Sequence, residues 1–197
     1  MTTKKRLAEQ VLLKLLGGKP RPDREIDIRE LMLDLDQLRD EYIKMSFYEN
    51  MKEGGYFVDQ EFLSTYTESI SAGSFSLPAK PIDLPRNMGV YIIYGEDIGE
   101  PFNIVDAGSM FIHRDKEELY EGGQYYIYFI GNTGKFKKVP TGLTTVNIVM
   151  VASSEDIDED DEYPLTPDAR SSILSALEAK YKLKLQLPHD EIEDGNK

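Results

Sequence analysis

The chain has 197 residues, no cysteine and a formal net charge of −13. This length suits one domain or a compact core with an appendage, and the lack of cysteine excludes thiol catalysis, disulfide frameworks and cysteine-ligated zinc. Residues 1–25 hold seven basic and three acidic residues (+4), so the remainder carries −17, and such an acidic body argues against sequence-specific nucleic-acid binding.

Residues 3–16 are predicted to form an amphipathic helix that ends at Gly17 and Gly18. Charged residues interrupt this stretch, so it does not resemble a signal peptide, and no apolar run approaches the roughly 18 residues that span a bilayer. We therefore expect a soluble protein without membrane contacts. The basic N-terminal segment predicts either a solvated helix end or contact with an acidic partner, including a second copy of the chain.

The next helix has the most regular pattern in the chain. Asp27 is a predicted N-cap, and apolar residues then recur at alternating steps of three and four residues. We expect this row to form the core face and the opposite, charged face to be solvated. The row consists of Ile28, Leu31, Leu35, Leu38, Tyr42 and Met45. The charged face consists of Arg29, Glu30, Asp34, Asp36, Arg39, Asp40 and Lys44.

The middle of the chain is predicted to be rich in β-strands. Alternating, β-branched and aromatic content indicates strands at residues 61–70, 89–95, 102–105 and 144–153. Residues 122–139 predict a hairpin that turns at GNTG. Both faces of its first strand are apolar or aromatic, so we expect this strand inside a sheet and covered on both sides. The prolines of residues 78–85 indicate an extended crossing between strands.

The last predicted helix begins at Pro167 after a Thr166 cap, and a polar tail follows it. The fold class is therefore predicted to be α+β. Two N-terminal helices and a C-terminal helix pack with a central antiparallel sheet or a small sandwich. The expected parts are a helical segment, a β-rich body, and an acidic loop with the C-terminal helix and tail, packed as one domain. They cover residues 1–53, 54–153 and 154–197.

Seven of the eight residues from Glu155 to Glu162 are acidic. A calcium-binding EF-hand loop beginning at Asp156 requires glycine at its sixth position and glutamate at its twelfth, where the chain has Asp161 and Pro167. The run is therefore predicted to be a solvated loop. The weak candidates for an opportunistic cation site are Asp156, Asp158 and Asp160, and no cofactor is expected.

Other catalytic patterns are missing or incomplete. The two histidines, His113 and His189, lie in no zinc-binding motif, and no nucleophile elbow is present. The only candidate acid–base pairing is His113 with Asp106 or Asp115. GNTGK at residues 131–135 lacks the first glycine and the Ser or Thr of a phosphate-binding loop. No enzymatic activity and no catalytic residue are predicted.

Two binding functions compete with a purely structural one. Tyrosines near the hairpin can form a stacking platform for carbohydrate or peptide, although core packing explains them too. These are Tyr120, Tyr125, Tyr126 and Tyr128. The acidic charge also allows an inhibitor that mimics DNA, which requires carboxylates spread over one face. Here they are concentrated in one loop and in the C-terminal tail.

The order of segments resembles a known family. DIRELMLDLDQLRDEYIK (residues 27–44) and LPAKPIDLPRNMGVYII (residues 77–93) carry the resemblance. They are similar to segments of ring and head-to-tail connector proteins of crAss-like and related tailed phages of Bacteroidetes. The resemblance implies a non-enzymatic virion structural protein, an adaptor subunit in a dodecameric ring of the neck or tail.

The resemblance also implies where this protein works and what it contacts. Its partners would be copies of itself, the portal and other neck or tail ring proteins, with DNA passing through the ring channel. It would be made in the host cytoplasm and located in the virion. The family supplies no catalytic residue to transfer onto this chain. The acidic loop is a candidate for the channel lining, since carboxylates offer phosphates no cationic partner.

Overall fold

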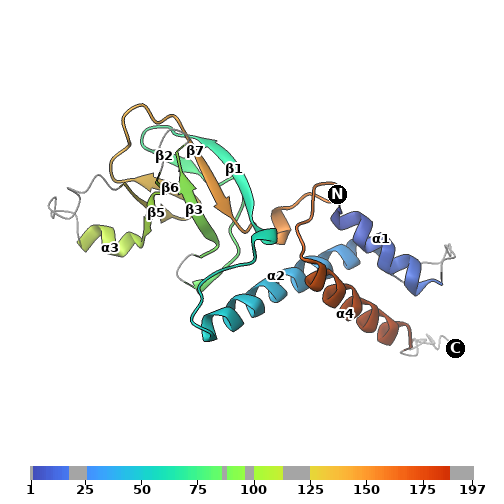
Figure 1. Cartoon of the computed structure of the whole chain (residues 1–197). Coiled ribbons are helices and arrows are strands. Elements are labelled where there is room, and N and C mark those ends of the chain that lie inside the picture. The colour runs from blue at the N-terminus through green and yellow to red at the C-terminus, as the bar shows by residue number, and fades with distance from the viewer. Residues whose placement is uncertain (1, 18–25, 86–87, 96–99, 113–124, 187–197) are drawn as a thin grey trace, which may run out of the picture. The chain divides into compact units, whose positions relative to one another are not determined.

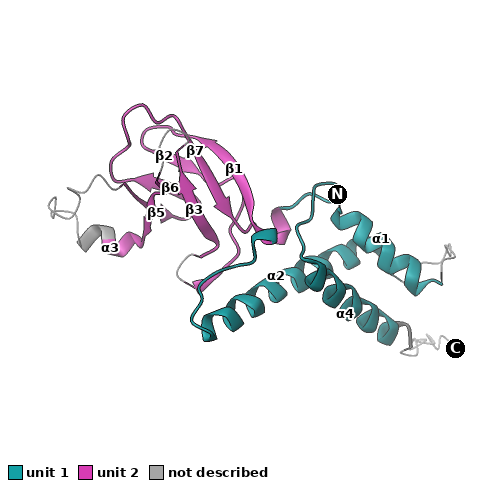
Figure 2. Cartoon of the chain, in the orientation of Figure 1, with its two compact units in different colours: residues 1–61, 157–197 teal, residues 62–156 magenta. Residues whose placement is uncertain are grey.

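The computed structural model describes residues 2–17, 26–85, 88–95, 100–112 and 125–186. Helices occupy both ends of the chain and two sheets occupy the middle, so the fold is α+β as predicted (Figure 1). The chain forms two compact units, which are residues 1–61 with 157–197 (unit 1) and residues 62–156 (unit 2; Figure 2). This division differs from the three expected parts because the two terminal segments fold together.

Unit 1 is built from three helices. They are α1 (Lys4–Leu15), α2 (Ile28–Lys52) and α4 (Pro167–Gln186). The sequence predicts all three, and the two predicted N-caps are formed: the side chains of Asp27 and Thr166 accept hydrogen bonds from the backbone N–H groups of Arg29 and Ala169. None of the helices among the described residues is long and apolar enough to cross a membrane.

The buried side of α2 differs from the predicted one. Leu31 and Leu35 are fully buried as expected, but the buried residues continue at four-residue steps through Ile43 to Phe47. Residues four apart form an oblique ridge on a helix, and this ridge is what neighbouring helices pack against. The row predicted from the sequence ends at Met45, whose side chain is 64% exposed. The predicted core face is therefore wrong for the second half of α2.

Unit 2 contains two sheets, where we expected one sheet or a small sandwich. The three-stranded sheet has the order β1 (Ser64–Ser69), β7 (Thr145–Met150) and β3 (Val90–Tyr94), all antiparallel. The four-stranded sheet has the order β2 (Ser74–Ser76), β6 (Thr133–Phe136), β5 (Tyr126–Ile130) and β4 (Asn103–Val105). In this sheet β4 runs parallel to β5, and the short helix α3 (Ala107–Ile112) follows β4.

All of the predicted strands form, and the predicted hairpin is β5–β6. Its turn leaves Ile130 paired with Thr133, and Gly131 takes a φ of +58°, a conformation that favours glycine. β5 lies inside its sheet as predicted, but it is not covered on both sides. Ile127 is fully buried, whereas Ile130 on the other face is 49% exposed.

One buried cluster takes side chains from both sheets. Val146, Ile148 and Met150 come from β7, and Phe75 and Ile127 come from β2 and β5. The rings of Phe102 and Phe136 meet edge to face in this cluster, with centroids 5.3 Å apart. Residues on alternate positions of each strand therefore face a shared apolar interior, and the remaining positions face outward.

Gly134 is predicted to be required for this packing. An added Cβ would lie 2.2 Å from Cζ of Phe75. Gly134→Ala should therefore lower the free energy of unfolding by about 1–3 kcal/mol, as overpacking does. Urea unfolding measures the change. Ser69→Ala, at an exposed strand position, serves as the control and should change stability by less than about 0.5 kcal/mol. Equal stabilities for the two variants would contradict this packing.

Candidate functional site

Unit 1 carries a groove of about 330 Å³ between α2 and α4. Apolar side chains form much of its wall, including Leu38, Ile173 and the exposed Met45. Ser46 and Ser172 line it as well. The full lining is Leu38, Glu41, Tyr42, Met45, Ser46, Glu49, Ser172, Ile173 and Ala176.

The chemistry of this groove suits contact with another protein. Its two formally charged residues, Glu41 and Glu49, are both acidic and both exposed. They favour a cationic group at the rim, while the apolar wall favours a buried side chain. Met45 adds a flexible, polarisable thioether that adapts to the shape of a partner.

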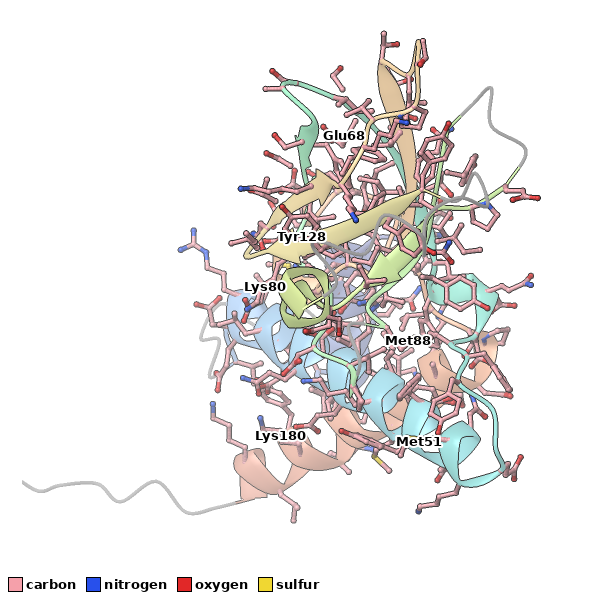
Figure 3. All side chains as sticks on the ribbon, turned by 90° about the vertical axis from the view of Figure 1, so that its left-hand side faces the viewer. Met51, Glu68, Lys80, Met88, Tyr128 and Lys180 are labelled. Carbon is pink, nitrogen blue, oxygen red and sulfur yellow. The ribbon has the colours of Figure 1, made fainter. Side chains whose placement is uncertain are left out.

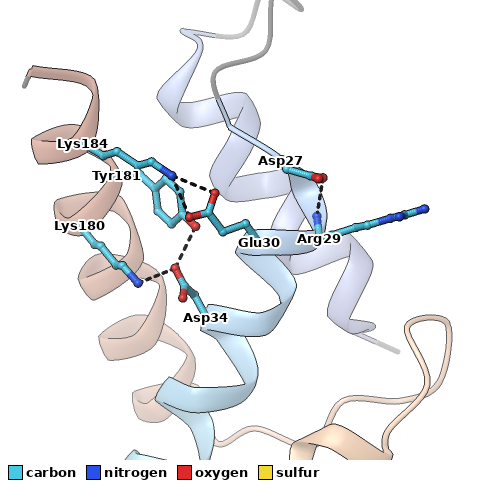
Figure 4. Close-up of polar contacts among 7 residues, drawn as sticks. All are labelled: Asp27, Arg29, Glu30, Asp34, Lys180, Tyr181 and Lys184. Atoms are coloured by element: carbon cyan, nitrogen blue, oxygen red, sulfur yellow. Dashed lines mark hydrogen bonds and ion pairs between the residues drawn. The ribbon is translucent and has the colours of Figure 1, made fainter. Parts of the chain in front are cut away.

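Polar contacts fix α4 against α2 (Figure 4). The carboxylate of Asp34 accepts hydrogen bonds from the Tyr181 hydroxyl at 2.8 Å and from Lys180 Nζ at 2.7 Å. Lys184 reaches both carboxylate oxygens of Glu30, at 2.8 and 2.9 Å. Burial raises the pKa of Tyr181, and the neighbouring carboxylate of Asp34 raises it further, so this hydroxyl stays a donor.

A second buried cluster joins α1 to α2. The carboxylate of Asp36 accepts hydrogen bonds from Lys4 Nζ and from the Tyr163 hydroxyl, both at 3.0 Å. Arg39 is fully buried; its Nε donates to the Pro164 carbonyl at 3.1 Å and its guanidinium lies 5.4 Å from the centroid of the Tyr163 ring. Burial raises the pKa of Asp36, although the hydrogen bonds from Lys4 and Tyr163 oppose this shift.

These clusters correct the predicted polar face of α2. Asp34, Asp36 and Arg39 were expected to be solvated, yet all three are buried. A buried charge requires a partner that neutralises it. Asp34 and Asp36 pair with lysines from segments distant in sequence, whereas Arg39 pairs with the adjacent Asp40 at 3.4 Å. The position of Arg39, midway between Leu35 and Ile43 on the four-residue ridge, is the one sequence feature that indicates its burial.

Three of the four basic residues that the structure describes in the N-terminal segment form ion pairs within unit 1. Lys4 pairs with Asp36, Lys14 pairs with Glu178 at 2.5 Å, and Lys5 lies 3.9 Å from Asp160. Two of the acidic groups that these lysines meet therefore belong to α2 and α4 of the same chain. The alternative of a solvated helix end is wrong for Lys4, which is buried.

The acidic run is an exposed loop, as its sequence predicts. In unit 2 the Asp156 carboxylate accepts a hydrogen bond from the Lys80 backbone N–H at 2.5 Å. In unit 1 the Asp161 N–H donates to the Asp158 carbonyl at 3.2 Å, which closes a turn. The described residues contain no group of three or more His, Cys, Asp or Glu side chains placed to hold a metal, so the candidate carboxylates of Asp156, Asp158 and Asp160 are not gathered into such a site.

The other candidate residues do not form a site in the described regions. Asp106 accepts hydrogen bonds from the backbone N–H groups of Gly108 and Ser109 at the start of α3. Its proposed partner His113 lies outside the described residues, as do Asp115, Tyr120 and His189. GNTGK is the β5–β6 turn and the start of β6.

The tyrosines in β5 and directly before it divide between two faces of the sheet. Tyr125 packs edge to face on Phe102, with centroids 6.1 Å apart, and belongs to the core side. Tyr126 and Tyr128 point to the other side and are half-buried. A single platform of Tyr125, Tyr126 and Tyr128 is therefore not formed.

No protein-family model matches the chain, and no curated protein matches it either. The function must therefore be inferred from the surfaces described above. Among these, the α2–α4 groove is a concave site whose walls are held by buried polar contacts on adjacent turns.

The Lys4–Asp36 pair is predicted to be strongly coupled. Lys4→Met or Asp36→Leu alone leaves one buried charge without its counter-ion and should cost about 3–5 kcal/mol of unfolding free energy. The double variant removes both charges and should be clearly more stable than the sum of the single effects implies. Urea unfolding of the wild type, the two single variants and the double variant measures this coupling. Additive costs would show that the pair does not interact.

The titration of Asp36 provides a separate test. Because Lys4 lowers the pKa of this carboxyl while burial raises it, Lys4→Met should move the pKa further upward from the wild-type value. A carbon-detected NMR titration of the Asp36 carboxyl follows the change directly. Lys52→Met, in the last turn of α2, is the matched control and should leave this pKa where it is. A downward shift in the Lys4 variant would contradict the geometry.

Proposed function

We propose that the chain is a virion structural protein, a ring or adaptor subunit in the neck or tail of a tailed phage, which works by assembly and not by catalysis. The observation that carries the proposal is the exposed, partly apolar α2–α4 groove with its acidic rim. The resemblance of residues 27–44 and 77–93 to connector proteins supports the same role.

The groove has the properties of a protein-docking site. Its two walls are fixed in advance by the contacts of Asp34 with Tyr181 and Lys180, so little conformational freedom is lost when a partner binds. Interfaces of this kind gain most of their affinity from a few buried aromatic or arginine side chains. The apolar wall with Glu41 and Glu49 nearby fits an arginine or an aromatic residue flanked by basic groups.

The proposed partners are further copies of the chain, the portal and neighbouring ring proteins. We take unit 2 to be a small sandwich that gives the subunit a rigid body, because side chains of both sheets enter one buried cluster. Contacts between two different surfaces of adjacent copies generate a closed ring when the rotation closes, here a dodecamer. The acidic surface would let DNA pass through the channel without binding to it.

A charge in the groove is predicted to block assembly. Met45→Glu places a carboxylate in the apolar wall beside Glu41 and Glu49, and should reduce partner binding by tenfold or more, which is about 1.4 kcal/mol. The assay is complementation of a phage that lacks the gene. The fraction of variant chain incorporated into virions is measured by immunoblot, together with the infectious titre.

Leu33→Glu is the matched control for this experiment. Leu33 lies on the same helix and is 63% exposed, close to the value for Met45, but it does not line the groove. Both variants should unfold within about 0.5 kcal/mol of the wild type, since both positions are exposed. Normal incorporation of Met45→Glu, or normal virions in the phage that lacks the gene, would contradict the proposal.

A further inference from the structure

The α2–α4 groove is walled by two helices that run in opposite directions. Glu30 of α2 binds Lys184 of α4, whereas Asp34, one turn later on α2, binds Lys180, one turn earlier on α4 (Figure 4). In Figure 3, Lys180 is labelled on the side of these contacts, and Met51 lies near the opposite, C-terminal end of α2. The groove therefore lies along an antiparallel helix pair whose register is fixed.

The groove lies away from the helix ends that lead into the undescribed segments of unit 1. Leu38, its first residue on α2, is about 15 Å along the helix from the start at Ile28. Ala176, its last residue on α4, is about 15 Å from the end at Gln186. The Met45 side chain in its wall is 64% exposed, and Ala176 is exposed too, so both walls present accessible surface.

Helical walls restrict what the groove can bind. In the interior of a helix, the N–H and C=O groups are already bonded to one another, and Leu38, Met45 and Ala176 are all interior positions. An extended peptide would find no backbone partner here, and its own polar groups would lose water against an apolar wall. A helix brings its backbone hydrogen bonds with it. The walls therefore favour a helical occupant.

The side chains along both walls have the spacing through which helices pack. On α2, Leu38, Tyr42 and Met45 are separated by steps of four and three residues. On α4, Ser172 and Ala176 are four residues apart. Their small side chains allow the axis of a neighbouring helix to approach to about 8–10 Å. A third helix laid along the pair would contact both walls.

The rim of the groove selects a basic occupant. Glu41 and Glu49 are exposed, and none of the ion pairs among the described residues involves either carboxylate. Glu49 also lies in the last turn of α2, where the helix dipole adds negative potential. Lysine and arginine can lay their apolar stems along the wall and place their charges at these carboxylates.

We propose that the groove binds an amphipathic helix of a different protein, in which an apolar row is flanked by lysine or arginine. This inference rests on the proposed function, since it names the class of partner at the same site. Helices of a second copy fit less well. The apolar residues of α1 and α4, such as Leu7, Val11 and Leu177, are buried in their own unit, and a second α2 would bring Glu41 and Glu49 to an acidic rim.

Designed peptides test the inference on the full chain. The probe is an alanine-rich helical peptide of about 15 residues, with leucines at i, i+3 and i+7 flanked by arginines. One control peptide has a central proline, which breaks the helix, and the other has glutamate in place of arginine. The probe should bind at least tenfold more tightly than either control. Fluorescence anisotropy measures the affinities, and the methyl NMR signal of Met45 reports binding in the groove.

A charge exchange separates docking in the groove from general attraction to an acidic chain. Glu41→Lys with Glu49→Lys should bind the arginine probe at least tenfold more weakly than the wild type does, and should bind the glutamate peptide more tightly. The matched control is Glu9→Lys with Glu155→Lys, which changes the net charge equally at exposed positions outside the groove. It should bind both peptides nearly as the wild type does.

Four results would overturn the inference. The first is a proline peptide that binds as tightly as the probe, and the second is an equal loss of affinity in the control and groove variants. The third is a probe that does not bind at about 1 mM, the weak limit of specific binding. The fourth is self-association of the wild type that Met45→Glu abolishes, which would assign the groove to a second copy.

The peptide results and the virion results fail independently. If no peptide binds the groove but Met45→Glu still blocks incorporation into virions, the helical partner is rejected and the proposed function is kept. If the probe binds as predicted but the chain is absent from virions, the helix-binding groove is kept and the proposed function is rejected.

Discussion

The burial of two carboxylates on α2 determines how unit 1 is built. Asp34 and Asp36 are two residues apart, so their side chains leave the helix about 200° from one another. One binds Tyr181 and Lys180 of α4, and the other binds Lys4 of α1 and Tyr163. A buried carboxylate requires these donors, so it selects one register for each neighbouring helix. The shape of the α2–α4 groove follows from that register.

Some charged side chains of unit 1 form ion pairs within the unit, and others remain exposed on its surface. Lys4 and Lys14 of α1 pair with carboxylates of α2 and α4, and Lys5 lies 3.9 Å from Asp160. The acidic residues 158–161 remain exposed. The α2–α4 groove with its acidic rim lies in the same unit. The proposed assembly role would use exposed, charged surfaces of this kind.

Local patterns in the sequence predict most of the elements but not their partners. Asp27 and Thr166 cap their helices through contacts within three residues, and strand alternation is a property of the strand itself. The burial of Asp34 and Asp36 depends on tyrosines 147 and 127 residues away. The groove likewise joins two distant helices, and the parallel pairing of β4 with β5 depends on long-range contacts. Sequence periodicity does not contain such information, which explains why Met45 was assigned to the core.

The most direct measurement of the central claim is the amount of this chain in purified virions. Quantitative mass spectrometry against isotope-labelled peptides gives its copy number relative to the portal protein. A ring subunit of the neck or tail predicts a fixed, small-integer ratio to the portal that survives extensive purification. A chain that is abundant in infected cells but missing from virions would contradict the assembly role.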